Sequence, residues 1–174
     1  MTNDPMWRLP EVAAFEVRSP DFADGGALPA WARAPGAGGQ GLSPELRWVG
    51  APDGTRSYVV RMHDPDAPTM SGFWHWAVYD LPASCDRLPR GAGTPASGLL
   101  PAGAVTVRNE VGGEEYTGAA PPSGHGEHRY FFVVSALDVE HLEVPAGATP
   151  AVLGFLLRTH ELARGMTMGT SVTP

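Results

Sequence analysis

Two segments rich in aromatic and β-branched residues constrain the fold of this chain more than any other feature. They span residues 73–81 and 128–137, and such a composition is typical of strands. Weaker strands are expected at residues 58–62 and 105–108. The 22 glycines and 18 prolines are scattered through the chain, which indicates many tight turns rather than one disordered tract. The sequence therefore predicts a mostly-β protein.

The alternation of side chains predicts which residues share a face of each strong strand, because successive side chains point to opposite faces. In the first segment, one face would carry Phe73, His75, Ala77 and Tyr79, and the other Trp74, Trp76 and Val78. In the second segment, one face would carry His128, Tyr130, Phe132 and Val134. Both faces of the first segment are bulky, so we expect a central strand that is covered on both sides.

One helix is expected near the C-terminus, and a second remains open. Thr149 can act as the N-cap, and Pro150 suits the first helical position. Four residues then recur at helical spacing, Leu153, Leu156, Leu157 and His160, and Gly165 fits the end. The remaining connections are too short for repeated βαβ crossovers, so the sheet should be largely antiparallel.

The length of 174 residues fits one domain spanning residues 1–174. Residues 1–14 are expected to form an irregular N-terminal extension, and residues 20–44, rich in Gly, Pro and Ala, an irregular segment laid over the core. Cys85 is the only cysteine, so no internal disulfide can form, which suits a reducing compartment. We expect Cys85 to be a small, unreactive residue.

The charge composition excludes several functions. All 12 basic residues are arginines, so neither a Schiff-base lysine nor a P-loop lysine is available. The net charge is −7 and no basic cluster is present, which argues against nucleic-acid binding. The chain shows no secretion signal, no apolar run long enough to cross a bilayer and no basic amphipathic helix. A cytoplasmic location without integral membrane association is therefore expected.

Titratable residues gather in two stretches, and each stretch leads into a strong strand. The first runs from His63 to Trp76, and the second from Pro121 to Tyr130. If the two strands pair, the rings of His75 and His128 can converge with Asp64 at one rim of the sheet. The loop that ends at Gly126 could present backbone amides to an anion, because glycine permits close approach.

Three chemistries fit such a cluster. The first is anion recognition by imidazole and tyrosine hydroxyl donors. The second is a metal site of two histidines and a carboxylate, for which His125 and His128 would also be spaced suitably. The third is acid–base catalysis in which Asp64 tunes a histidine. The structural alternatives are that His75 or His128 is a packed core residue and that Asp66 only forms a turn. No nucleophile elbow is present, which argues against a Ser-His-Asp hydrolase.

These stretches resemble the signatures of the phosphatidylethanolamine-binding protein family, nearest to its bacterial and archaeal Raf-kinase-inhibitor-like branch. They are DPDAP at residues 64–68, GFWHWAVY at 72–79 and GHGEHRYFF at 124–132. The resemblance runs from Ser19 to Thr170, nearly the whole chain. It implies a central antiparallel sheet packed on a smaller sheet, with one or two helices at the side. It also implies an anion pocket made, by position, of Asp64, His75, His128 and Tyr130, with walls and loops from Asp66, Pro68, Phe73, Pro121 and Pro122.

We expect a non-catalytic small-ligand-binding protein with neither metal nor cofactor, because the pocket residues are present and no nucleophile is evident. Family members bind phospholipid head groups, phosphate, acetate and similar anions, and bacterial members are commonly homodimers. Some eukaryotic relatives inhibit kinases or serine proteases, so a protein partner is a second expectation. An acid–base lyase or cyclase that uses the same cluster is a third. The chain departs from the family pattern at residues 38–41 and at His63, Glu127 and Ser171. The departures at Glu127 and Ser171 leave the identity of the ligand open.

Overall fold

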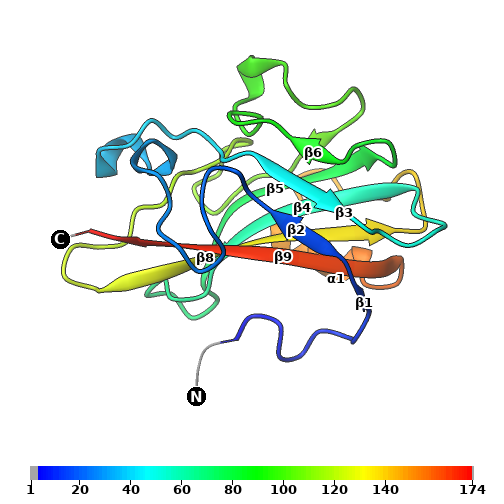
Figure 1. Cartoon of the computed structure of the whole chain (residues 1–174), viewed down its shortest axis with the longest axis horizontal. Helices are drawn as coiled ribbons and strands as arrows, with labels where there is room; N and C mark the ends of the chain where they lie inside the picture. Colours follow the sequence, from blue (N-terminus) through cyan, green and yellow to red (C-terminus); the bar gives the residue numbers. More distant parts are fainter. Residues whose placement is uncertain (1–3, 174) are drawn as a thin grey trace.

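The computed structural model describes residues 4–173 and contains two sheets (Figure 1). The larger sheet has six strands in the order β1 (Ala13–Ala14), β9 (Glu161–Val172), β8 (Glu127–Leu137), β4 (Ser57–Asp64), β5 (Phe73–Pro82) and β7 (Val105–Thr106). All neighbours are antiparallel except β1 and β9. The smaller sheet has the order β2 (Glu16–Arg18), β3 (Leu46–Val49) and β6 (Arg87–Leu88). This arrangement confirms the predicted fold class.

Each face of the larger sheet is covered. The main core lies between the two sheets, where Met62, Trp76 and Phe132 are fully buried. On the opposite face, Leu153 and Leu157 of the helix α1 (Pro150–Leu157) pack in a second, smaller core. Figure 1 shows β2 and β3 in front of the larger sheet and α1 behind it. Strand β5 contributes to both cores, as its bulky faces predict.

A β-bulge corrects the predicted faces of β5. Met62 of β4 lies opposite Trp76, but the next residue, His63, lies opposite Trp74, so His75 is an extra residue on β5. As a result, Trp76 packs in the main core, whereas Trp74 stacks on the His63 ring on the other face, with ring centroids 4.3 Å apart. The prediction that the two tryptophans share a face was wrong because strict alternation fails at a bulge.

The predicted helix begins as expected but ends earlier. The Thr149 side chain accepts a hydrogen bond from the Val152 amide and Pro150 is the first helical residue. The helix ends at Leu157, and the region around Gly165 belongs to the 12-residue strand β9, which the sequence analysis did not predict. A Cβ at Gly165 would lie 2.5 Å from the Phe15 carbonyl oxygen, so this glycine permits the close approach of the N-terminal strands.

The remaining segments mostly follow the predictions. Residues 20–44 contain only two short 3₁₀ turns, η1 (Ala30–Ala32) and η2 (Pro35–Ala37), and Phe22 and Leu28 of this segment enter the main core. A third turn, η3 (Pro95–Ser97), lies between β6 and β7. The strand expected at residues 105–108 has only its first two residues. In the extension expected at residues 1–14, residues 4–12 are irregular and β1 follows, while residues 1–3 lie outside the described part. Within residues 4–173, no helix has the length and apolar character needed to span a bilayer.

Candidate ligand-binding pocket

A hollow of about 350 Å³ lies where β4 ends and β5 and β8 begin, and we call it the strand-end pocket. Its volume is at the lower end of the range for small-molecule sites. The following residues line it: Asp64, Ala67, Pro68, Thr69, Phe73, His75, Val111, Thr117, Gly118, Ala120, Pro122 and His128. Six of the ten residues predicted for ligand binding are in this set: Asp64, Pro68, Phe73, His75, Pro122 and His128. The two strong strands, β5 and β8, do not pair with each other as supposed from the sequence; each pairs with β4, whose last residue is Asp64, and this brings the two predicted stretches together.

Asp64 is the polar centre of the strand-end pocket. It is the last residue of β4 and only 3% exposed. Its Oδ1 accepts hydrogen bonds from the amides of Asp66 (2.8 Å) and Ala67 (3.0 Å), and its Oδ2 lies 2.8 Å from His128 Nδ1. Because a carboxylate only accepts hydrogen bonds, His128 Nδ1 must be protonated. The DPDAP turn thus holds the carboxylate, and the carboxylate orients the His128 ring.

A second imidazole continues this hydrogen-bonded series. His128 Nε2 lies 2.7 Å from Nδ1 of His125, a residue exposed to solvent. When His128 is neutral, its Nε2 accepts a hydrogen bond that His125 Nδ1–H donates. The result is a chain from the buried Asp64 through His128 to the surface, which we call the Asp-His-His chain. The spacing of His125 and His128 produces direct pairing of the rings, and no group of metal-ligating residues occurs in the described part of the chain.

His75 contributes a neutral imidazole to the pocket. Its Nδ1–H donates to the Thr117 carbonyl oxygen at 2.7 Å, so the neutral ring has Nε2 as its acceptor. Burial lowers the pKa of His75 to about 4, because the charged form is poorly solvated there. At neutral pH this residue therefore offers an acceptor and no positive charge, unlike the donor expected from the sequence.

The other four predicted residues lie outside the lining. Asp66 instead forms a fork with Arg129: its Oδ1 lies 2.7 Å from Nη2 and its Oδ2 2.8 Å from Nε. This pairing lowers the pKa of Asp66 and attaches the DPDAP turn to the start of β8. Tyr130 is fully buried, with its ring edge-on to His75 at 5.2 Å, and its hydroxyl lies near the Ala120 amide without hydrogen-bond geometry. Pro121 and Gly126 belong to the loop beside the pocket.

One wall of the pocket comes from a loop that the sequence analysis did not single out. Val111, Thr117, Gly118 and Ala120 lie in the connection between β7 and β8. Asn109 organises this loop: its amide nitrogen donates to the Glu115 carbonyl and the Thr117 hydroxyl, and its Oδ1 accepts from the Val111 and Gly113 amides. The succession of Asn109, Gly112 and Gly113 is a turn signal that could have revealed this element.

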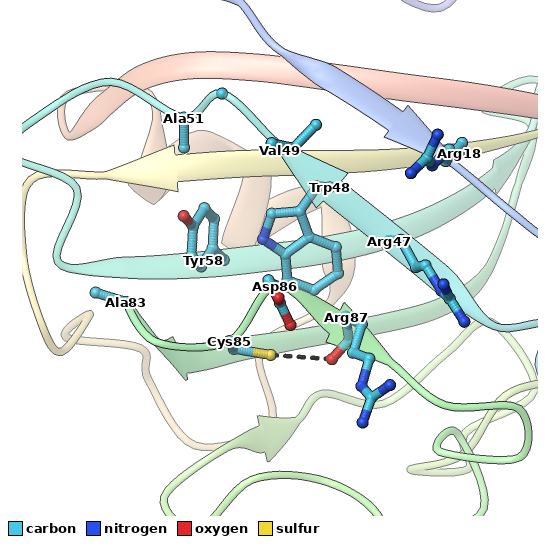
Figure 2. Close-up of a pocket in the computed structure, with 11 residues that line it drawn as sticks. Arg18, Arg47, Trp48, Val49, Ala51, Tyr58, Ala83, Cys85, Asp86 and Arg87 are labelled. Atoms are coloured by element: carbon cyan, nitrogen blue, oxygen red, sulfur yellow. Dashed lines mark hydrogen bonds between the residues drawn. The ribbon is translucent and has the colours of Figure 1, made fainter.

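A hollow of about 630 Å³ on the smaller sheet contains none of the predicted residues (Figure 2). Arg18, Arg47 and Arg87 lie side by side on β2, β3 and β6. Two acidic residues partly neutralise this row: Glu45, just before β3, lies 2.6 Å from Arg47 Nε, and Glu16 of β2 lies 3.5 Å from Arg18 Nη1. Cys85 donates its thiol hydrogen to the Arg87 carbonyl, and burial raises its pKa, which agrees with the expected unreactive role.

The chain is similar to several known proteins over most of its length. UPF0098 protein YbhB of Escherichia coli K12 is 47% identical over 153 residues, which cover 86% of this chain and 94% of YbhB. UPF0098 protein YbcL of the same strain is 41% identical over 155 residues, covering 88% of this chain and 85% of YbcL. The crystal structure of YbcL matches with a TM-score of 0.88 at 38% identity, over 93% of this chain and 100% of that one.

A third relative extends the match to another bacterium. The phosphatidylethanolamine-binding protein homologue CT736 of Chlamydia trachomatis has a TM-score of 0.78 at 30% identity, over 92% of this chain and 99% of that one. The family model described as phosphatidylethanolamine-binding protein matches residues 18–172, a range that contains both sheets except β1 and β2's first residues. The chain therefore belongs to the phosphatidylethanolamine-binding protein family.

Proposed function

We propose that the strand-end pocket binds a small ligand through an anionic oxygen, as in a phosphate, a phospholipid head group or a carboxylate. The observation that carries this proposal is the Asp-His-His chain. In its protonated form, His128 can donate Nε2–H to a ligand oxygen while the Asp64 carboxylate balances its charge. The partner that now occupies Nε2 is the exposed His125, whose hydrogen bond a ligand oxygen can replace.

The second histidine narrows the ligand class. His75 is neutral and offers an acceptor, so it favours a ligand that also carries a hydrogen-bond donor. A monoprotonated phosphate has an anionic oxygen and a P–OH group, and phosphoethanolamine has phosphate oxygens and an ammonium group. Apolar walls from Pro68, Phe73 and Val111 surround these polar atoms, which limits the pocket to one compact polar group. Acetate meets the first requirement alone and should bind more weakly.

Isothermal titration calorimetry tests the proposal with phosphate, phosphoethanolamine and acetate. We expect competition at one site, with phosphate or phosphoethanolamine tighter than acetate. His128→Gln, which keeps the side-chain length but cannot carry charge, should lose at least about tenfold in affinity. His141→Gln is the matched control, because the His141 side chain is 79% exposed and pairs with Asp80 away from the pocket lining. Absence of binding at millimolar concentrations to the wild type would reject the proposal.

Acid–base catalysis is a second candidate, and the same chain favours it. A hydrogen-bonded series of a carboxylate and two imidazoles can carry a proton from the pocket to solvent. A panel of small phosphorylated and carboxylated substrates tests it. Turnover that is equal in the wild type and His128→Gln would reject this candidate and leave the binding proposal untouched.

A further inference from the structure

A second hollow, of about 400 Å³, lies on the opposite face of the larger sheet, and we call it the helix-side hollow. Its walls come from residues 5–10, from β4, β5 and β8, and from α1. The two hollows lie back to back, because His63 lines one and the following residue, Asp64, lines the other. No acidic side chain lines the helix-side hollow in the described part of the chain.

A buried arginine without a carboxylate partner lies in this hollow. Arg61 is 6% exposed, its Nη2 donates only to the Ser135 hydroxyl at 3.2 Å, and its Nε has no hydrogen-bond partner. The nearby carboxylate of Glu161 is engaged by Ser135 and by Arg164. Burial lowers the pKa of Arg61 to about 10, so the guanidinium is still charged at neutral pH. A buried charge without a direct counter-ion is costly, and within the described residues the guanidinium has the Ser135 hydroxyl as its acceptor and no carboxylate.

The surroundings of Arg61 are positive at the rim and apolar along the walls. Arg8 and Arg158 line the hollow and are exposed, and the Arg158 guanidinium lies 4.0 Å from the centroid of the Phe155 ring. Trp74 and Phe155 provide aromatic walls. Glycine at position 154 gives the guanidinium its space, since a Cβ there would lie 2.9 Å from Arg61 Nη1.

His63 adds a second unsatisfied group to the same hollow. Its Nε2 lies 3.2 Å from the Ser71 carbonyl oxygen, and its buried Nδ1 has no partner. Burial lowers the pKa of His63, which favours the neutral ring with Nε2–H donating to Ser71 and Nδ1 as acceptor. The donor Arg61 Nε–H and the acceptor His63 Nδ1 therefore both lack hydrogen-bond partners on one face of β4.

We propose that the helix-side hollow is a second binding site, for an amphipathic acid: a carboxylate on an apolar aliphatic body. The carboxylate meets the Arg61 guanidinium, and the apolar body lies against Trp74, Phe155 and Leu9. The volume of the hollow is within the range of small-molecule sites. This site does not depend on the strand-end pocket, because the two share no lining residue.

Octanoate titrated into the full chain tests this site by calorimetry, with octanol and acetate as probes that lack the charge or the apolar body. We expect saturable octanoate binding and at least tenfold weaker binding of the other two. Arg61→Met should reduce octanoate affinity at least tenfold, and Arg61→Lys should retain part of it. Saturating phosphate, which is proposed to occupy the strand-end pocket, should leave the octanoate affinity of the helix-side hollow unchanged. Arg56→Met is the matched arginine control, because Arg56 is exposed and paired with Glu140.

Three results would overturn the proposal. One is the absence of octanoate binding at millimolar concentration, including the case in which a second copy of the chain covers this face in a dimer. Another is octanol binding as tightly as octanoate, which would show an apolar groove without charge recognition. The third is unchanged octanoate affinity in Arg61→Met. If Arg61 variants do not fold, Arg158→Ala serves as the test instead. Loss of this cation at the rim of the hollow should weaken octanoate binding at least twofold.

Discussion

The two hollows on opposite faces of β4 and β5 differ in how their polar groups are satisfied. In the strand-end pocket, Asp64 accepts hydrogen bonds on both oxygens, and His128 has a partner at each ring nitrogen. In the helix-side hollow, Arg61 Nε and His63 Nδ1 have none. Buried polar groups are normally paired, so these two unpaired groups are the reason that a second ligand site is proposed in the helix-side hollow.

A polar group whose hydrogen bonds are all made within the protein can still be available to a ligand, so hydrogen-bond pairing alone does not decide whether a hollow is a binding site. The polar groups of the strand-end pocket are hydrogen-bonded to one another, and the exposed His125 is the one that a ligand is proposed to displace. The helix-side hollow instead keeps a charge that its own residues do not neutralise. Removing Asp64 from the strand-end pocket should therefore lower the free energy of unfolding, whereas removing Arg61 from the helix-side hollow should leave it equal or raise it.

Asp64→Ala should produce the largest loss. It leaves His128 Nδ1 and the amides of Asp66 and Ala67 without their acceptor in a buried site. We expect the free energy of unfolding to fall by about 3 kcal/mol or more, together with loss of phosphate binding. Urea denaturation measures the first and calorimetry the second. The control Asp53→Ala, on an exposed turn, should change stability by less than about 0.5 kcal/mol.

His75→Asn should remove a pH dependence of stability. The folded-state pKa of about 4 lies below the ordinary value of 6.5, so the unfolded chain binds more protons between these two values. The free energy of unfolding should therefore decrease as the pH falls from about 6.5 towards 4, by up to roughly 1.4 kcal/mol per pH unit. Asparagine can still donate to the Thr117 carbonyl but does not titrate. An equal slope in the wild type and the variant would show that His75 is not held neutral.

Arg61→Met should affect stability in the direction opposite to Asp64→Ala. Methionine replaces an uncompensated buried cation with an apolar side chain of similar length, so the free energy of unfolding should stay equal or rise by about 1 kcal/mol. Thermal and urea unfolding without added acid measure it. A loss of more than about 2 kcal/mol would mean that Arg61 is a structural partner of Ser135 and Glu161, and the contrast between the two hollows would disappear.

His125→Ala should have the smallest effect, and it should increase affinity. The His125 ring occupies the Nε2 atom of His128 that an anion is proposed to use. Removing this competitor should lower the Kd for phosphate by up to about threefold, since one neutral hydrogen bond no longer has to break. The exposed position of His125 predicts little change in stability. A weaker Kd would instead make His125 a direct ligand contact.

Sequence reasoning predicted the fold class and the convergence of Asp64, His75 and His128, because the strong strands and the Asp-Pro turn are local signals. It missed β9 because the small residues Ala163, Gly165 and Gly169 have weak strand propensity, and pairing with β8 and packing against Phe15 and Leu28 stabilise them there. It missed the direction of Trp74 because a bulge changes the alternation. It did not single out Arg61, whose significance depends on what the tertiary structure leaves unpaired.

Nuclear magnetic resonance of the histidine ring nitrogens during a phosphate titration is the decisive experiment for anion binding in the strand-end pocket. We expect His128 Nε2 and His125 Nδ1 to shift together and saturate at one site, because phosphate replaces the contact between them. His160, which pairs with Asp138 outside the strand-end pocket, should not shift. Unchanged His128 and His125 resonances at millimolar phosphate, or equal shifts of His160, would contradict the assignment of the strand-end pocket as an anion site.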